Sequence, residues 1–315
     1  MALFRAPFTI WGDMATYNIL KEAVVYIYNT ANTTYYRLDV TEDLSFSQTF
    51  TDKTYPQKTL HDQHKLHEAS NVKAANPANF ELTIPALTQN DLDVVFNLLV
   101  DTSSNTLNTF DLYIKLPNDS YKLEKCVITS GTFIIEKLEN LKLTISGEAK
   151  KLTRGDNLLS GVSLPARGTR TEQLIRYVSA TVDGTDITSG LFSISIELQN
   201  EISWTAHETV NNALLVTNAA TSMYPSNFIL SKRILSGSLG KYVTSDFNSD
   251  VQTWETNAAI VIKAGESATS GFQLDLANCT FTNRVNVGDV FTQMYDWKMN
   301  DNPTDLGSKV KFNNI

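Results

Sequence analysis

The stretch Phe192–Ala206, FSISIELQNEISWTA, alternates apolar and polar side chains along almost its whole length. One face is apolar and is interrupted only by Asn200; it carries Ile194, Ile196, Leu198, Ile202 and Trp204. The opposite face is polar and carries Ser193, Ser195, Glu197, Gln199, Glu201, Ser203 and Thr205. A period of two is typical of a β-strand with one buried and one solvated face. At about 3.3 Å per residue such a strand spans roughly 45 Å, so we expect a partner strand of similar length.

An earlier stretch, Arg37–Gln48 (RLDVTEDLSFSQ), has a similar pattern. Its apolar residues Leu38, Val40, Leu44 and Phe46 match Ile196, Leu198, Ile202 and Trp204, and Glu42 takes the place of Asn200. Its polar residues Asp39, Thr41 and Asp43 match Glu197, Gln199 and Glu201. Two copies of one pattern predict a long strand over residues 37–48 and an internal duplication.

Further features recur in the same order. A long polar loop, Phe50–Ala78, has a counterpart at His207–Ser226, and the loops end in the related sequences PANFEL and PSNFIL, which align Phe80 with Phe228. A helix is predicted at Asp91–Val100, capped by Asn90, and a second one after Ser245. A hairpin and a closing strand complete each copy, at 110–146 and 259–297. We therefore expect an all-β fold with one short helix per repeat, in two tandem β-sandwich or barrel domains.

The expected domain boundaries follow from this order. The first domain is residues 1–155 with an N-terminal arm at 1–20, and the second is residues 171–315 with a C-terminal tail at 299–315. Residues 156–170, within a stretch rich in Gly, Ser and Pro, are expected to link them.

Composition excludes several classes of protein. The chain has 315 residues, of which 19% are charged and 42% hydrophobic, a globular composition. A net charge of −8 argues against a surface that grips nucleic acid through phosphates. We see no signal peptide and no membrane-spanning run, and we expect Cys126 and Cys279 to be buried free thiols in a protein made inside the cell.

Catalytic and metal-binding motifs are weak or missing. The sequence has no phosphate-binding loop, nucleophile elbow, C-x-x-C or H-E-x-x-H. His61, His64 and His67 have helical spacing and could hold a metal, but a solvated or interface loop is the favoured interpretation. The carboxylate pairs Asp39/Asp43 and Glu197/Glu201 could act as acid and base, yet a repeated solvated strand face explains them better. We therefore expect no enzyme activity and no cofactor.

Long strands with free edges favour self-assembly. An exposed edge pairs readily with another chain, and a ring of chains removes the edges. Head-to-tail stacking of rings gives an open-ended tube. The long loops are the expected ring-to-ring contacts, through Tyr55, His61, His64, His67, Leu214 and Leu215. The expected core anchors are Phe46, Trp204, Phe80 and Phe228.

The segments FSQTFTDKTYPQKTLHDQ, NPANFELTIPAL and VITSGTFIIEKLENLKLTISG, in this order, resemble the tail tube proteins of tailed bacteriophages. The duplication is similar to the T5-like branch, in which three chains with two tube domains each form a ring that others build from six. This resemblance implies a structural protein of the virion, made in the bacterial cytoplasm, whose stacked rings form a hollow tube for DNA ejection. Its implied partners are further copies of itself, a tape measure, a terminator, distal-tail or baseplate proteins, and a sheath where the tail is contractile.

The polar face is then expected to line the lumen, with Asp39, Thr41, Asp43, Glu197, Gln199 and Glu201 repelling the phosphates of passing DNA. A low-copy terminator, distal-tail or baseplate tube protein of the same fold is an alternative. A β-sandwich module for carbohydrate binding or adhesion is less favoured, because no aromatic-lined loop pocket is evident.

Overall fold

The computed structural model describes residues 20–30, 32–57, 67–86, 88, 91, 94–95, 98–99, 107–136, 138–156, 158–167, 174–205, 223–243, 257–300 and 310–312. Antiparallel strands dominate this part of the chain, which confirms the predicted all-β fold class. A short 3-10 turn, Leu20–Glu22, precedes the first strand.

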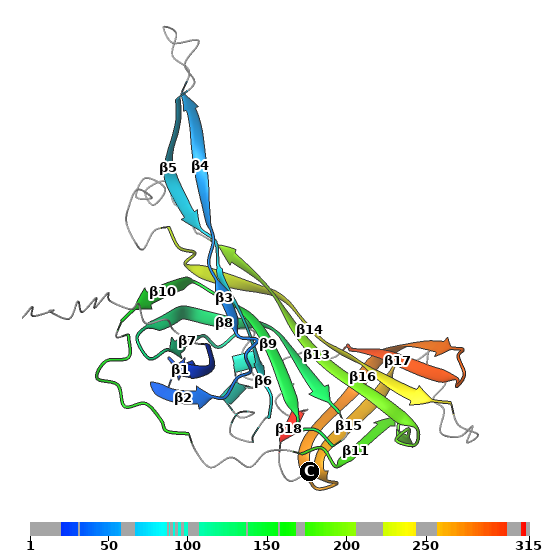
Figure 1. Cartoon of the computed structure of the whole chain (residues 1–315). Coiled ribbons are helices and arrows are strands. Elements are labelled where there is room, and N and C mark those ends of the chain that lie inside the picture. The colour runs from blue at the N-terminus through cyan, green and yellow to red at the C-terminus, as the bar shows by residue number, and fades with distance from the viewer. Residues whose placement is uncertain are drawn as a thin grey trace, which may run out of the picture.

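The first half of the chain contains ten strands among the described residues (Figure 1). They are β1 (Val24–Asn29), β2 (Thr34–Leu38), β3 (Ser45–Ser47), β4 (Phe50–Gln57), β5 (His67–Ala75), β6 (Ala78–Ile84), β7 (Phe110–Lys115), β8 (Ser120–Ile135), β9 (Lys142–Ala149) and β10 (Lys151–Gly155). The described strands of the second half are β11 (Tyr177–Val182), β12 (Thr185–Asp186), β13 (Leu191–Thr205), β14 (Asn227–Tyr242), β15 (Ala258–Ser267), β16 (Ser270–Asn286), β17 (Thr292–Met299) and β18 (Val310–Phe312).

Strand pairing follows one order in both halves. In the first half the ladder runs β2-β1-β7-β8-β9-β6-β3, and β10 pairs with the start of β8. In the second half it runs β12-β11-β15-β16-β17-β14-β13, and β18 pairs with the start of β16. The pairing of β7 with β8 and that of β15 with β16 even share a register shift, between Phe110 and Leu112 and between Ala258 and Ile260.

The long strand predicted at Phe192–Ala206 is present as β13, but the prediction of a matching strand over residues 37–48 is wrong. Strand β2 ends at Leu38, the chain turns, and β3 begins only at Ser45. The Thr41 backbone N–H donates to the Thr83 carbonyl at 2.9 Å inside this turn. Leu38 and Leu44 are both buried, so a turn fixed against the core reproduces the alternation of a strand.

The residues matched between the two stretches have matching partners: Phe46 pairs with Phe80 of β6, and Trp204 pairs with Phe228 of β14. The neighbouring strands favour a different register between the halves. Phe80 pairs with Gly147 of β9, whereas Gly237, opposite Ile196, pairs with Trp297 of β17. When Gly147 is aligned with Trp297, Phe46 lies at the place of Ile196 and Phe80 at the place of Gly237.

Within the predicted long polar loop, residues 50–57 and 67–75 form two paired strands. Strands β4 and β5 pair from Phe50–Ala75 to Gln57–His67, and they project from the body in Figure 1. They follow directly on β3 and lead directly into β6, so together they match the long hairpin of β13 and β14. Alternation fails to reveal this hairpin because, in the sequence of both strands, polar residues fall at odd and even positions alike.

Helical residues lie where the first helix was predicted. Residues 91, 94–95 and 98–99 are helical, and Val95, Leu98 and Leu99 are buried. Thr88 acts as the N-cap: its hydroxyl accepts from the Asp91 N–H at 3.2 Å, and its own N–H donates to the Asp91 carboxylate at 2.9 Å. The predicted cap, Asn90, and the predicted second helix lie outside the described residues.

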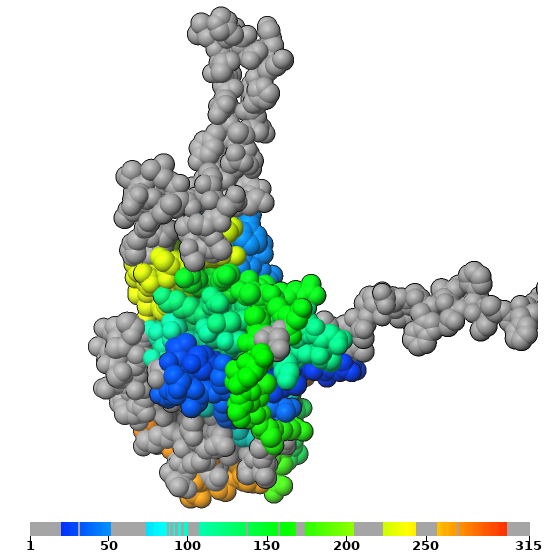
Figure 2. Space-filling model, turned by 90° about the vertical axis from the view of Figure 1, so that its left-hand side faces the viewer, coloured from blue at the N-terminus to red at the C-terminus, as the bar shows by residue number. Residues whose placement is uncertain are grey.

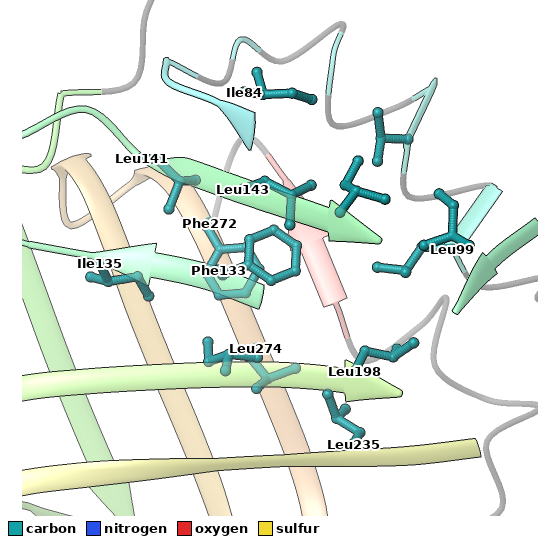
Figure 3. Close-up of a cluster of buried hydrophobic side chains, with 14 of the residues drawn as sticks. Ile84, Leu99, Phe133, Ile135, Leu141, Leu143, Leu198, Leu235, Phe272 and Leu274 are labelled. Atoms are coloured by element: carbon teal, nitrogen blue, oxygen red, sulfur yellow. The ribbon is translucent and has the colours of Figure 1, made fainter. Parts of the chain in front are cut away.

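One hydrophobic core runs through both halves. It includes buried side chains of β1, β7, β11 and β15 and of β6, β9, β14 and β17. Phe80 of β6 contacts Phe110 of β7 edge to face, with ring centroids 6.1 Å apart. Figure 3 shows Phe133 of β8 stacked beside Phe272 of β16, with ring centroids 5.2 Å apart. Both predicted free thiols, Cys126 and Cys279, are confirmed as buried and unbridged.

The two halves are also joined by a ladder of hydrogen bonds. The end of β8 pairs with β13 over six residue pairs, from Ser130–Gln199 to Ile135–Ile194. Within the described part of the expected linker, Leu159 packs with Tyr26 and Tyr113 of the first half. Figure 2 shows this green segment beside the blue surface of β1 and β2.

Candidate assembly surface: the polar face of the wall sheet

Eight strands form one continuous sheet across the two halves, in the order β3-β6-β9-β8-β13-β14-β17-β16. We call it the wall sheet. Only the ends of β8 and β16, Val127–Ile135 and Cys279–Asn286, belong to it. Alternate side chains are buried against the core, as the pattern of β9 illustrates, and the others form the polar face of the wall sheet.

Hydroxyl groups are frequent on this polar face. The Thr83 and Thr144 hydroxyls lie 3.1 Å apart between β6 and β9. The Ser195 and Ser238 hydroxyls lie 2.9 Å apart between β13 and β14. Side chains of neighbouring strands thus hydrogen-bond to each other on the polar face, which favours a stiff, hydrated surface over a binding cleft.

Charges on the polar face are of both signs. The ladder places the acidic residues Glu81, Glu148, Glu197, Glu201 and Asp296 there together with the basic residues Lys142, Lys232, Arg284 and Lys298. Lys232 lies 3.6 Å from Glu201, and Arg284 lies 2.7 Å from Asp296. The acidic residues predicted on β13 therefore share the polar face with basic residues, which come from strands that share no sequence pattern with β13.

The three residues predicted on β13 are on the polar face as predicted from the alternation. Glu197 accepts a hydrogen bond from the Gln199 amide at 2.7 Å, and both point away from the core. Glu201 is exposed and forms the ion pair with Lys232.

The matching residues of the first half lie in the turn between β2 and β3. Asp39 forms ion pairs with Arg37 at 3.5 Å and with Arg167 at 2.8 Å, so its charge is neutralised beside the segment that follows β10. The Thr41 hydroxyl donates to Asp43 at 3.3 Å. The structure thus does not join these three to Glu197, Gln199 and Glu201 in one row.

Two of the expected ring-to-ring residues belong to the projecting hairpin. Tyr55 lies in β4 opposite Ala69, and His67 begins β5 opposite Gln57. His61, His64, Leu214 and Leu215 lie outside the described residues. No cluster of metal-ligating side chains occurs among the residues whose side chains are described, a set that leaves out all three histidines of the predicted metal site.

The expected core anchors have different environments. Phe80 is buried at 3% exposure, and Phe46 is half-buried against Tyr121. Trp204 and Phe228 are half-buried and contact each other with ring centroids 5.5 Å apart. This pair belongs to the far end of the β13–β14 hairpin rather than to the buried core.

Trp204 also contacts a half-buried carboxylate. Its indole N–H donates to Glu148 at 2.7 Å. Burial raises the pKa of Glu148, and the hydrogen bond from Trp204 offsets part of this rise.

Sequence reasoning missed the role of Asn200, which it treated only as a break in the apolar stripe. Asn200 is 3% exposed and joins the two halves. Its amide donates to the carbonyls of Leu99 at 3.2 Å and Ile128 at 3.0 Å, and its oxygen accepts from Arg233 at 2.9 Å. A lone Asn within an apolar stripe was the available signal, since a buried amide needs specific partners.

A family model matches residues 15–314, and its description is the Bacteriophage Baseplate Tube Protein Family. The chain belongs to this family. The match covers nearly the whole chain, so the polar face, the wall sheet and the hairpin are all features of a phage tube protein of the virion. It does not single out the T5-like branch of major tail proteins.

Comparison with curated proteins gives no match. Within the described residues, no helix is long and apolar enough to cross a bilayer.

Proposed function

We propose that this baseplate tube family member is a non-enzymatic structural subunit, with no cofactor, that joins other copies edge to edge into a ring around a channel. The wall sheet carries this proposal. It is continuous over eight strands, buries one face in the core and leaves a polar face free. At its two ends β3 pairs only with β6, and the last part of β16 pairs only with β17, among the described strands.

The number of chains in the ring follows from an internal duplication, which we infer because the two halves share one strand order. Each half contributes four strands to the wall sheet, so one chain acts as two units of the ring. Three chains then supply six units, the arrangement expected from the resemblance to phage tubes.

We assign the polar face to the channel. Ion pairs such as Arg284–Asp296 and the frequent hydroxyls leave no strong net field there. A surface of this kind neither holds phosphates by counterion release nor repels them strongly, so DNA passes without being retained.

We assign the β4–β5 hairpin to contacts between the ring and whatever is stacked on it, because it projects along one direction from the body (Figure 1). The family match favours a low-copy tube of the baseplate at least as well as the repeated ring of a long tail.

Electron microscopy and mass photometry of the purified full chain, over a range of concentrations, test the proposal. We expect rings of three chains, and stacks of rings at high concentration. A strictly monomeric protein at the highest soluble concentration would contradict it. A variant in which a short Gly-containing turn replaces residues 50–75 should still form rings but should not stack.

The channel assignment has its own test. Glu81→Lys with Glu197→Lys turns the polar face basic, and assembled rings should then retain short duplex DNA, as measured by fluorescence anisotropy at low salt. Glu266→Lys with Glu124→Lys adds the same charge outside the polar face and serves as the control. Equal retention by both variants would exclude the polar face as the channel lining.

A further inference from the structure

The junction between the two halves of the chain shows how the two unpaired edges of the wall sheet could pair with each other. The second half is joined to the first by β13 pairing with the end of β8. When the strand orders of the two halves are aligned, β13 corresponds to β3 and β16 corresponds to β8. The unpaired end of β16 therefore corresponds to the end of β8, which is paired with β13. The unpaired strand β3 corresponds to β13 itself.

The internal junction is stabilised by backbone hydrogen bonds and by apolar burial. Phe133 and Ile135 of β8 face the same side as Ile194 and Ile196 of β13. All four are at most 8% exposed. Burial of large apolar side chains is the main favourable contribution to such a contact, so a junction of six residue pairs holds the two halves firmly.

The shared register shift fixes which residues correspond. Phe110 pairs with Cys126, and Ala258 pairs with Cys279, each just before the shift. Two residues after Cys126 along β8, Ile128 pairs with Gly147. Two residues after Cys279 along β16, Phe281 pairs with Trp297. Gly147 therefore corresponds to Trp297.

Beyond a bulge in β8, Phe133 pairs with Leu143, four residues before Gly147. Val285 pairs with Gln293, four residues before Trp297. Val285 of β16 thus corresponds to Phe133 of β8, and Phe46 of β3 corresponds to Ile196 of β13.

We propose that the Thr282–Val287 edge of one copy pairs antiparallel with residues 44–49 of a second copy, in the register of the internal β8–β13 junction. This inference rests on the proposed ring. It gives six residue pairs between chains: Leu44–Val287, Ser45–Asn286, Phe46–Val285, Ser47–Arg284, Gln48–Asn283 and Thr49–Thr282. Every junction around the ring, within a chain or between chains, then has one geometry.

The side chains of the free edge fit this partner. Val285 is 57% and Val287 76% exposed, while Phe133, the counterpart of Val285 in the internal junction, is 4% exposed. Pairing would place Val285 beside Phe46 and Val287 beside Leu44, as Phe133 lies beside Ile196 and Ile135 beside Ile194. Asn283 adds a second observation, because its buried amide atoms have no hydrogen-bond partner within the described structure.

Disulfide trapping tests the register directly. In a Ser47→Cys/Arg284→Cys variant, the two thiols of neighbouring copies face each other at a cross-strand distance compatible with a disulfide. Non-reducing electrophoresis after mild oxidation should show covalent dimers and trimers. The unsubstituted chain should show none, because Cys126 and Cys279 are buried.

Two matched variants control for geometry. Thr132→Cys/Glu197→Cys is the same pair in the internal junction, and it should give a disulfide within one chain and no multimers. Ser47→Cys/Thr280→Cys keeps the face but moves the second thiol by about 13 Å, and it should give few multimers.

The outcomes separate this inference from the proposed function. Rings in the microscope without preferential trapping of the Ser47/Arg284 pair would overturn the register and leave the ring standing. Absence of any association, with the internal control pair formed, would overturn both.

A second measurement does not depend on cysteine chemistry. Val285→Lys should abolish ring formation while the thermal midpoint of the monomer stays unchanged, since this side chain is exposed in the free chain. Val290→Lys is the control, because Val290 is also 57% exposed and lies outside the six pairs. Equal ring formation by the two variants would contradict the inference.

Discussion

At the scale of single residues, Asn200 shows how one polar group can position two halves of a chain. Its three hydrogen bonds reach Leu99, Ile128 and Arg233. We expect Asn200→Ala to lower the free energy of unfolding by roughly 2–3 kcal/mol, because it leaves buried carbonyls without a donor. Urea unfolding of the monomer measures this change. Asn79→Ala, at an exposed position, is the control, and a loss no larger than in the control would contradict the assigned role.

Glu148 gives a residue-scale prediction of pH dependence. Its pKa is raised by burial in the folded state, so ionisation opposes folding. The penalty is absent below the unfolded-state pKa and grows as the pH rises through the raised pKa of the folded state. Glu148→Gln keeps an acceptor for the Trp204 N–H and removes the charge. We expect a higher thermal midpoint than wild type at pH 7, and a difference that vanishes near pH 4; a constant difference would contradict this.

At the scale of strands, the two halves solve one packing problem in opposite ways. In the first half Phe80 of β6 pairs with Gly147 of β9. In the second half the glycine is Gly237 of β14 and the aromatic residue is Trp297 of β17. Each pair therefore combines one aromatic residue with one glycine. The aromatic residue is on β6 in the first half, but in the second half it is on β17, the counterpart of β9.

This pairing predicts a steep cost for any side chain at Gly147. A Cβ there would lie 2.2 Å from the Phe80 ring and 2.5 Å from the Val127 carbonyl oxygen. We expect Gly147→Ala to destabilise the monomer by about 1–3 kcal/mol, measured by urea unfolding. Adding Phe80→Leu should recover only part, since the carbonyl contact remains. Gly288→Ala, whose Cβ would meet nothing closer than 3.7 Å, should be nearly neutral.

The strands that alternation predicts correctly are those with one face in the core, such as β13. Alternation also places Glu197, Gln199 and Glu201 on the polar face. It fails for residues 37–48, where a turn held by the Thr41–Thr83 hydrogen bond has the same pattern. It could not predict the basic residues of the polar face, because Lys232 and Lys298 join it only through the ladder.

At the scale of the whole molecule, the core crosses the expected domain boundary. Phe133 and Phe272 stack between the halves, and β13 seals the edge of β8 (Figure 3). The halves should therefore unfold together. We expect Phe133→Ala to cost about 3–5 kcal/mol and to lower protection from hydrogen exchange equally in β9 and β17. Loss of protection in the first half alone would show that the halves are independent.

The sealing of β8 by a strand from the second half also has a consequence for synthesis. A ribosome releases β8 well before β13, so a nascent chain carries an open edge with Phe133 and Ile135 uncovered. A neighbouring nascent chain on the same messenger can offer its own β13 to that edge. The fold thus has a built-in route to exchanged halves, and slow translation between residues 136 and 190 would increase such swapping.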